Sequence, residues 1–465
     1  MIKIINCKCF KGNLKLTLIG LLLIVISGTI YSQKVWSLRD CIYYALDNNI
    51  QVKQSELTSE NNKINLLQSK LDLLPTVNGS LSHTYGWGRS IDFATYTYAN
   101  QNTQQSYFTF SSDLTIFNGL QKYNTIKQNQ FEYLASKYDS DKMKDDISLN
   151  IAAAYLQILF YIEIVATAED QVEITKLQID RTEKLVNAGT LAKGSLFDIQ
   201  AQGATEEVNL INARNSLNLS YLDLLQLLDK SASEKLEIEK PELSITTVPE
   251  LLPPEQIYSY AILNLPEIKS AEYRLQSANK GLSIARGYRS PSLSLRGGWN
   301  TSYSDQIKYS NPIEPNYGDI IPFSNQFNDN QNKTLQVSLS IPIFNGFQVS
   351  SYISQSKLAA ENAQYNLQLS KNQVRKNVET AFADALSAFK SYNANEKSLN
   401  AYTEAFKYME QKFDVGLINA LDYNVAKTQL TKAKSDLLSA KYDYIFKTKI
   451  LDFYMGKPIT LEEYK

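Results

Sequence analysis

The sequence IFNG occurs twice in this chain, at Ile116–Gly119 and at Ile343–Gly346, and the two copies are 343 − 116 = 227 positions apart. Each copy ends a stretch in which apolar and polar residues alternate, as they do in a strand with one apolar face. Each is followed by a helical pattern without proline or glycine, over residues 120–188 and 348–415. Because Asn-Gly accommodates a positive φ, the sequence predicts that two strands turn sharply and directly into long helices.

The repeat extends over nearly the whole chain. Gly189 matches Gly416 at the same offset of 227, and Pro75 matches Pro291 at an offset of 216. The difference, 227 − 216 = 11 residues, falls in the Asn-, Pro- and Gly-rich residues 304–332, which are typical of a loop. We therefore expect two structural repeats, each with the order helix, β-hairpin, long helix, turn, helix. The repeats cover residues 33–230 and 254–457, with hairpins at 76–117 and 291–344.

Three further segments complete the predicted organisation. Residues 231–253 are expected to form an equatorial structure beside the middle of the helices, and residues 458–465 a C-terminal tail. Residues 1–32 combine lysines with a short apolar run, Leu16–Ile30, and predict a secretory signal peptide. A membrane anchor is the alternative, but the run is shorter than the ~20 residues that a bilayer requires. Removal of the leader would leave Cys41 as the only cysteine, so no internal disulfide is expected.

Composition argues against several functions. The 47 basic and 48 acidic residues nearly balance, so a nucleic-acid surface is not indicated. His83 is the only histidine, and the sequence has no nucleophile, phosphate-loop or metal-ligand spacing. We therefore expect neither an enzyme nor a cofactor nor a metal site. After the leader, no apolar segment is long enough for a membrane-spanning helix, so we expect that the chain is either soluble or crosses a membrane as strands.

The strands leave these two possibilities open when taken alone, because a soluble sandwich gives the same alternation. Two hairpins cannot close a barrel, and open sheet edges are not tolerated in hydrocarbon, whereas three chains with four strands each would close twelve strands. The sharp joints between strand and helix would then share one ring. They lie at Pro75, Asn118, Gly119, Pro291, Asn345 and Gly346.

The helices are unusually long. At 1.5 Å per residue, each uninterrupted pattern predicts a helix of about 100 Å. In the first of them, a 4-3-4-3-4 spacing of apolar residues beginning at Ile147 predicts a coiled-coil seam, and it recurs 227 positions later from Val374. The four shorter helices are about half as long, and we expect them to stack end to end in two pairs: 195–229 with 254–290, and 38–74 with 422–455.

Together these features resemble the TolC-type outer-membrane efflux proteins. The resemblance covers Leu38 to Pro458 and depends on the twin IFNG, the prolines before strands, and the turn sequences AGTLAKGSLFDIQAQ and VGLINALDYNVAKTQ. It implies an α+β membrane protein: a homotrimer with a 12-stranded β-barrel that continues into a periplasmic α-helical coiled-coil barrel. It also implies contact with outer-membrane lipid, with a periplasmic adaptor protein and with an inner-membrane transporter of the RND or ABC type.

The resemblance assigns roles to a few residues. The periplasmic tips, which contact the adaptor and narrow the tunnel, would be Gly189, Thr190 and Leu191 in one turn and Gly416, Leu417 and Ile418 in the other. Asp422 matches the family's gate aspartate and would form a carboxylate ring in the trimer. A second gate carboxylate would fall on Val425, and Ile418 replaces a basic residue, so the gate is less polar here. Ordinary helix caps at the tips, and a first-turn role for Asp422 favoured by the helix dipole, are the alternatives.

The resemblance implies one of two functions, and we expect the first of them because it is the commoner assignment in the family. One is the passive exit duct of a tripartite efflux pump for small molecules, and the other is the exit duct of type I protein secretion. A secreted structural coiled-coil protein is an alternative of another class, but it leaves the paired amphipathic hairpins unexplained. Four aromatic residues near strand ends, Tyr85, Trp87, Tyr107 and Trp299, would belong to an interfacial girdle, or pack simply as strand residues.

Overall fold

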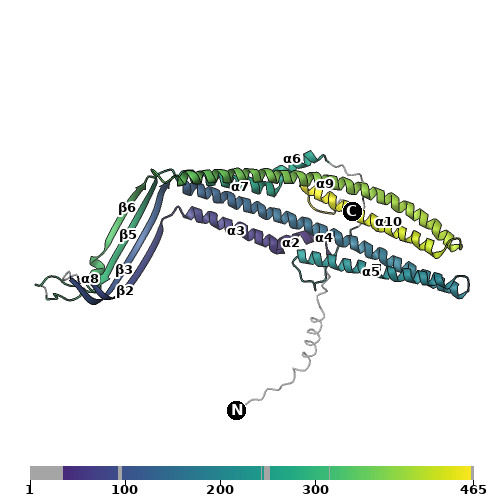
Figure 1. The fold of residues 1–465 in the computed structure, drawn as a ribbon, viewed down its shortest axis with the longest axis horizontal. Coiled ribbons are helices and arrows are strands. Elements are labelled where there is room, and N and C mark those ends of the chain that lie inside the picture. Colours follow the sequence, from purple (N-terminus) through teal and green to yellow (C-terminus); the bar gives the residue numbers. More distant parts are fainter. Residues whose placement is uncertain are drawn as a thin grey trace, which may run out of the picture.

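The computed structural model describes residues 35–92, 97–241, 243, 245, 252–313 and 315–461. The signal peptide expected at residues 1–32 lies outside the described residues, as do parts of the 231–253 segment and of the C-terminal tail. The chain is strongly elongated, with a sheet at one end and a bundle of long helices at the other (Figure 1).

Two very long helices form the frame. They are α4 (Gln121–Asn187) and α9 (Gln348–Asp414), each of 67 residues and therefore about 100 Å long, as predicted. At the tip, α4 turns into α5 (Lys193–Leu227) and α9 turns into α10 (Ala420–Tyr454). Most seam residues at the centre of both long helices are buried, and Ile151 and Val378 are completely so. The seam residues Ala154, Tyr161 and Tyr392 are only partly buried.

The two helices that precede the strands are broken, which the sequence did not predict. The first consists of α2 (Leu38–Asn48) and α3 (Ile50–Leu71), and the second of α6 (Pro254–Asn264) and α7 (Pro266–Gly287). Pro266 has no N–H to continue a helix and favours an extended residue before it. In the first repeat Asn49 separates α2 from α3 as the N-cap of α3. Its side-chain oxygen accepts hydrogen bonds from the N–H groups of Gln51 and Val52.

The expected pairing of the short helices was wrong. In the structure α3 and α5 both pack along α4, and α10 packs along α9, while α7 lies against both long helices (Figure 1). The Asn49 amide donates to the carbonyl of Leu227, so the end of α5 meets the break between α2 and α3. The reason is connectivity: each short helix is joined to its own long helix, either through the tip turn or through the adjacent hairpin, and remains beside it.

The sheet has four antiparallel strands in the order β2-β3-β5-β6. They are β2 (Thr76–Asp92), β3 (Thr97–Asn118), β5 (Ser292–Ser304) and β6 (Asn332–Ser340). The second hairpin was expected to reach residue 344, but β6 ends at Ser340, which pairs with Ser292. The neighbouring Pro291 has no N–H to extend the ladder, so residues 341–344 have no partner on that side.

A short helix lies in the segment expected to be a loop. It is α8 (Phe323–Asp329), which packs against β5 at the end of the sheet remote from the long helices (Figure 1). The equatorial part contains a small parallel pair, β1 (Val35–Trp36) with β4 (Glu237–Ile238). Tyr155 of α4 donates to the carbonyl of Glu239 at 2.7 Å and fixes this pair to the helical core.

The central part of α4 is apolar enough to cross a membrane by length and composition, contrary to the expectation that no such helix follows the leader. Its residues Ile151, Tyr155 and Ile158 belong instead to a core shared with α2, α5 and α10. This is the composition of a helix buried in a helical bundle.

Candidate functional site

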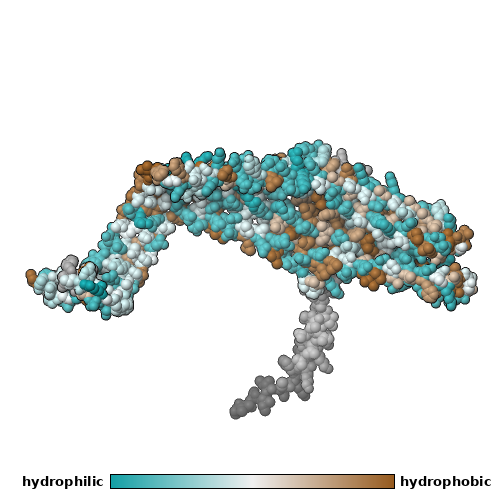
Figure 2. Space-filling view, viewed as in Figure 1, coloured by the Kyte–Doolittle hydropathy of each residue, from teal (hydrophilic) through white to brown (hydrophobic). Residues whose placement is uncertain are grey.

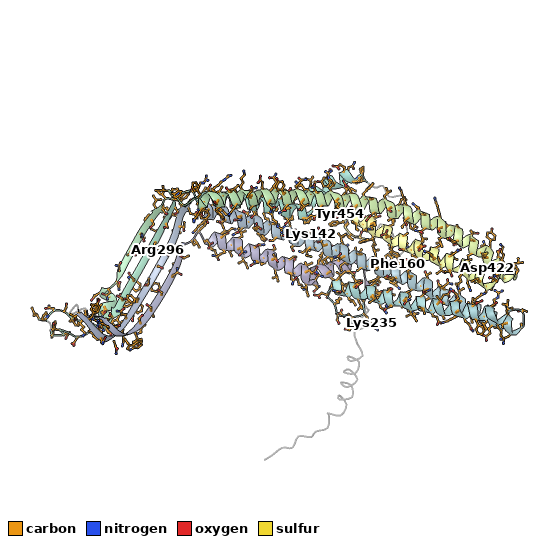
Figure 3. All side chains as sticks on the ribbon, viewed as in Figure 1. Lys142, Phe160, Lys235, Arg296, Asp422 and Tyr454 are labelled. Atoms are coloured by element: carbon orange, nitrogen blue, oxygen red, sulfur yellow. The ribbon has the colours of Figure 1, made fainter. Side chains whose placement is uncertain are left out.

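The sheet has one apolar and one polar face. Directly paired residues of antiparallel strands share a face, and the ladder from Leu81 and Phe108 to Leu295 and Val337 is apolar. Most of this face is exposed in the single chain, in which Leu335 is 77% and Val337 64% exposed. The opposite face carries Ser, Thr and Asn residues and the ion pair between Arg296 and Asp113 (Figure 3). A soluble sheet would bury its apolar face, whereas this arrangement suits a barrel with lipid outside and water inside.

The strand register corrects two expectations about the sheet, the position of Tyr107 and the alternation at Ile116. Tyr85, Trp87 and Trp299 lie on the apolar face, but Tyr107 pairs with Ser82 and Ser302 on the polar face and does not belong to a girdle. A bulge at Ile116 shifts the alternation, so that Phe117 rather than Ile116 lies opposite Leu293.

The edges of the sheet are open. Among the described strands, β2 and β6 each have a partner on one side only. Beyond the end of β6 an apolar segment is exposed, with Ile343 at 94% and Phe344 at 78%. Figure 2 shows hydrophobic residues at this corner, where the sheet gives way to α9. Unpaired edges with an exposed apolar face require further strands from other chains.

The two joints between strand and helix have the same backbone geometry. Gly119 (φ 66°) is followed by Leu120 (φ 61°), and Gly346 (φ 59°) by Phe347 (φ 65°). The positive φ expected of the Asn-Gly turns is present, whereas the second left-handed residue at each joint was not predicted. A Cβ at Gly119 would also meet the carbonyl oxygen of Gly287, while the space around Gly346 is open. Pro75 and Pro291 lie just before β2 and β5, where the helix ends.

Both helical tips end in a Schellman motif. The N–H of Gly189 (φ 78°) donates to Val186 and that of Thr190 to Leu185, both at 3.0 Å. Gly416 (φ 76°) and Leu417 make the same bonds to Phe413 and Lys412. Leu191 is 37% and Leu417 74% exposed, so both tips present apolar side chains to their surroundings. The backbone hydrogen bonds at each tip are therefore those of an ordinary helix cap. The exposed leucines also give each tip an apolar surface that a partner can contact.

Asp422 lies near the tip end of the helical part (Figure 3). It is exposed and is the third residue of α10, and its N–H donates to the side-chain oxygen of Asn419 at 2.8 Å. This is the first-turn position that a helix dipole favours for an acidic residue. Its carboxylate is free to face other subunits, so a role in a gate remains a prediction.

The links that join the helical hairpins near the tips include two ion pairs, neither of which was predicted. Arg181 of α4 contacts Asp414 of α9 at 2.7 Å. Lys427 of α10 donates to the hydroxyl of Thr175 and lies 3.5 Å from the carboxylate of Glu206. Lys427 and Glu206 are each only 5% exposed, and burial is the main cause that lowers the pKa of Lys427. Lysines on helices are usually solvated, so nothing in the sequence indicates this buried pair.

Comparison with known proteins agrees with this geometry. The sequence profile of the family described as "Outer membrane efflux protein" matches residues 41–229 and 257–457. The outer membrane protein TolC of Escherichia coli K12 is 27% identical over 325 residues, which cover 66% of this chain and 60% of TolC, so the match spans less than two thirds of that relative. The outer membrane efflux protein BepC of Brucella suis is 20% identical over 425 residues, 91% of this chain and 86% of BepC.

Solved structures show the same fold. A crystal structure of CusC superimposes with a TM-score of 0.76 at 18% identity and covers 92% of this chain and 96% of CusC. The outer membrane protein VceC of Vibrio cholerae gives a TM-score of 0.74 at 15% identity, with coverage of 90% and 96%.

The fold class is thus that of an outer-membrane channel subunit, in which three chains supply four strands each to a barrel that continues into a helical coiled-coil barrel. The chain belongs to the outer membrane efflux protein family. It is a protein of the outer membrane that extends into the periplasm, and its family consists of channels rather than enzymes.

Proposed function

We propose that this protein is the passive exit duct of a tripartite efflux pump, through which small molecules pass from the periplasm or an inner-membrane transporter to the exterior. The observation that carries the proposal is the open four-stranded sheet with an exposed apolar face, joined by two left-handed turns to helices of about 100 Å. Such a chain gains a continuous water-filled path only when three copies close their sheet edges.

The tips would be the contact sites for a periplasmic adaptor. Two turns of matching geometry at the far end of the helices expose Leu191 and Leu417, and apolar residues on rigid turns suit a protein partner. The adaptor would connect the duct to an inner-membrane transporter of the RND or ABC type. Opening would separate the helical hairpins, which Arg181–Asp414 and Lys427–Glu206 hold together.

The names of relatives favour small molecules over secreted proteins. CusC of Escherichia coli is named a cation efflux system protein, and SrpC of Pseudomonas putida is named a solvent efflux pump outer membrane protein. These names describe those relatives. Type I protein secretion remains the second candidate, because the duct is the part that both kinds of system share.

A deletion strain tests the choice. We expect deletion to increase the sensitivity of the cells to drugs, solvents or metal ions and to leave the secreted proteins unchanged, with recovery on complementation. Loss of a secreted protein without any change in sensitivity would favour the secretion duct. As a separate test of the channel itself, the purified protein in planar bilayers should conduct ions once Arg181→Ala removes the half-exposed link to Asp414 and loosens the tips; a silent bilayer would contradict the proposal.

A further inference from the structure

The insert between β5 and β6 places a short helix on the membrane-facing side of the sheet. Phe323 and Phe327 of α8 contact Phe108 of β3, with ring centroids 6.0 and 5.2 Å apart, and Phe327 also contacts Trp299 of β5 at 6.0 Å. Phe108 and Trp299 lie on the apolar face, as the strand register shows. The helix therefore covers the outer end of the surface that faces lipid lower down.

Hydrogen bonds fix this helix to the strand. The buried side chain of Gln326 accepts from the N–H of Ser304 and donates to its carbonyl, both at 2.9 Å. The hydroxyl of Thr301 donates to the carbonyl of Phe327 at 2.8 Å, and the amide of Asn330 donates to Ser302 at 2.8 Å. With three side chains satisfied in this way, α8 is a built part of the sheet rather than a loop that happens to lie near it.

The other side of α8 is polar. Ser324, Asn325, Asn328 and Asp329 are all exposed and point away from the two phenylalanines by the helical period. The helix thus replaces an aromatic surface by hydroxyl, amide and carboxylate groups. Hydrocarbon tails would leave these groups without partners, whereas the headgroup layer can hydrogen-bond them.

The position of α8 agrees with the height of the membrane. On β6 the apolar face runs from Leu335 downward and continues in the exposed Ile341 and Ile343, and Lys333 ends it above. On β3, which is strand throughout, the nine steps from Phe108, which α8 contacts, to Phe117 cover about 31 Å at ~3.4 Å per residue. With a strand tilt of ~40° this is about 23 Å along the membrane normal, close to the ~25 Å apolar band of such barrels. Lys333 pairs with Trp299, so α8 begins where the band ends.

We infer that α8 is a membrane-boundary helix: it rests in the headgroup layer of the outer leaflet and sets the level at which the lipid-facing surface of the barrel ends. Three copies in the trimer form an interrupted collar around the barrel. The inference depends on the outer-membrane location of the protein and is independent of what the duct exports.

Spin labels on single cysteines test the depth of α8 in proteoliposomes. The labelled variants are Ser324→Cys and Asn328→Cys on α8, with Val337→Cys in the apolar band and Lys407→Cys on periplasmic α9 as controls. The wild-type chain, in which Cys41 is fully buried, gives the background. Three relaxing agents report position: oxygen in hydrocarbon, a nickel chelate attached to lipid headgroups, and a free nickel complex in water.

We expect the headgroup nickel to relax the two α8 labels more than either control, oxygen to relax Val337→Cys most, and free nickel to relax Lys407→Cys most. Relaxation of the α8 labels like that of Val337→Cys would place the helix in the acyl chains, and relaxation like that of Lys407→Cys would place it in water. Immobile labels that no agent reaches would mean that a neighbouring subunit covers α8. Each of these three results overturns the inference.

A second measurement uses Trp299 as the reporter. In a background with Trp36→Phe and Trp87→Phe, Trp299 is the only tryptophan of the chain. Its fluorescence should be quenched weakly by brominated lipids, because Phe327 shields it. Substitution of both phenylalanines, Phe323→Ala with Phe327→Ala, should release α8 and increase the quenching while the trimer persists. Unchanged quenching would show that α8 does not limit the contact of the barrel with lipid.

Discussion

Lys427 lies almost fully inside the helical part, where its ammonium group contacts Thr175 and faces the carboxylate of Glu206. Three helices meet at this point, since Thr175 belongs to α4, Glu206 to α5 and Lys427 to α10. Lys427 is therefore one of the residues that connect the second helical hairpin to the first.

Replacement of Lys427 should strongly destabilise the helical part. Lys427→Met leaves the carboxylate of Glu206 buried without a cation, and we expect a loss of about 3 kcal/mol in the free energy of unfolding of the helical part, measured by circular dichroism in detergent. Lys432→Met is the matched control, because Lys432 forms an exposed pair with Asp436 and its loss should cost less than about 1 kcal/mol. Addition of Glu206→Leu to Lys427→Met should recover much of the loss. Equal effects of Lys427→Met and Lys432→Met would contradict the buried pair.

Asp145 of α4 gives a pH-dependent prediction. Burial, and then the nearby Asp146 and Asp141, raise the pKa of its carboxyl from 3.8 to about 6. The folded chain therefore holds the proton more tightly than the unfolded chain, so the destabilising effect of the charge is absent below about pH 4 and complete above about pH 6.

Asp145→Asn should accordingly raise the thermal midpoint at pH 7.5 and leave it unchanged near pH 4. The exposed Asp443 supplies the control, since Asp443→Asn replaces a solvated carboxylate and should change the thermal midpoint little at pH 7.5. A gain that is the same at both pH values would remove the charge of Asp145 as its cause.

Asp422 is the residue at which the gate proposal can be tested alone. A ring of three carboxylates at the tip would attract cations, so Asp422→Asn should reduce the preference for cations in bilayer recordings. Because Asn also accepts hydrogen bonds and the cap from Asn419 uses only the backbone N–H, folding should be preserved. Selectivity equal to that of the unsubstituted channel would assign Asp422 to the helix start only.

At the scale of elements, the joints between strand and helix decide the shape of the chain. Each joint combines a left-handed glycine with a left-handed residue after it, and at this point the direction of the chain changes from sheet to bundle (Figure 1). The two joints differ in their surroundings, because Gly119 is packed against Gly287 and Ser290 whereas Gly346 is open.

This difference gives a paired prediction. Gly346→Ala strains only the backbone and should destabilise the subunit by about 1–2 kcal/mol. Gly119→Ala adds the clash with the carbonyl of Gly287 and should have the larger effect, measured as the yield and thermal midpoint of the assembled protein. If both substitutions lowered the thermal midpoint equally, the close packing at Gly119 would contribute nothing to the stability of the protein.

The elements also show how far a sequence can predict such a fold. The order of helices and strands, the two joints and the two tip turns follow from the repeat and from Asn-Gly and Gly positions, which are local signals. The helix breaks at Asn49 and Leu265 were missed, although Pro266 marks one of them. The helix α8 was missed because its sequence, FSNQFND, favours no helix and forms one through the contacts of Phe323 and Phe327 with the sheet.

Among the candidate site residues, those that depend on the backbone were placed well and those that depend on tertiary contacts were not. Gly189 and Gly416 have the positive φ expected at the tips. The burial of Lys427 and Glu206 and the pairing of the short helices depend on which faces meet, and a single sequence contains no direct signal for that. The roles of Asp422 and of the tips depend in addition on other subunits and partners.

At the scale of the whole molecule, a single chain contains strands and helices of a channel but does not enclose a channel by itself. Its apolar sheet face is exposed and its edge strands β2 and β6 are open, so the isolated subunit would present unpaired backbone groups to hydrocarbon. Closure by three chains satisfies the edges and places the Arg296–Asp113 face toward water. The elongated form then connects the outer membrane with the periplasm along a single axis.

Native mass spectrometry of the detergent-purified protein tests this account most directly, because it counts the chains in one folded particle. The account predicts a species of three chains as the dominant folded form, with little monomer before denaturation. A stable, folded monomer that keeps its strand content in detergent would contradict the closure of the sheet between subunits.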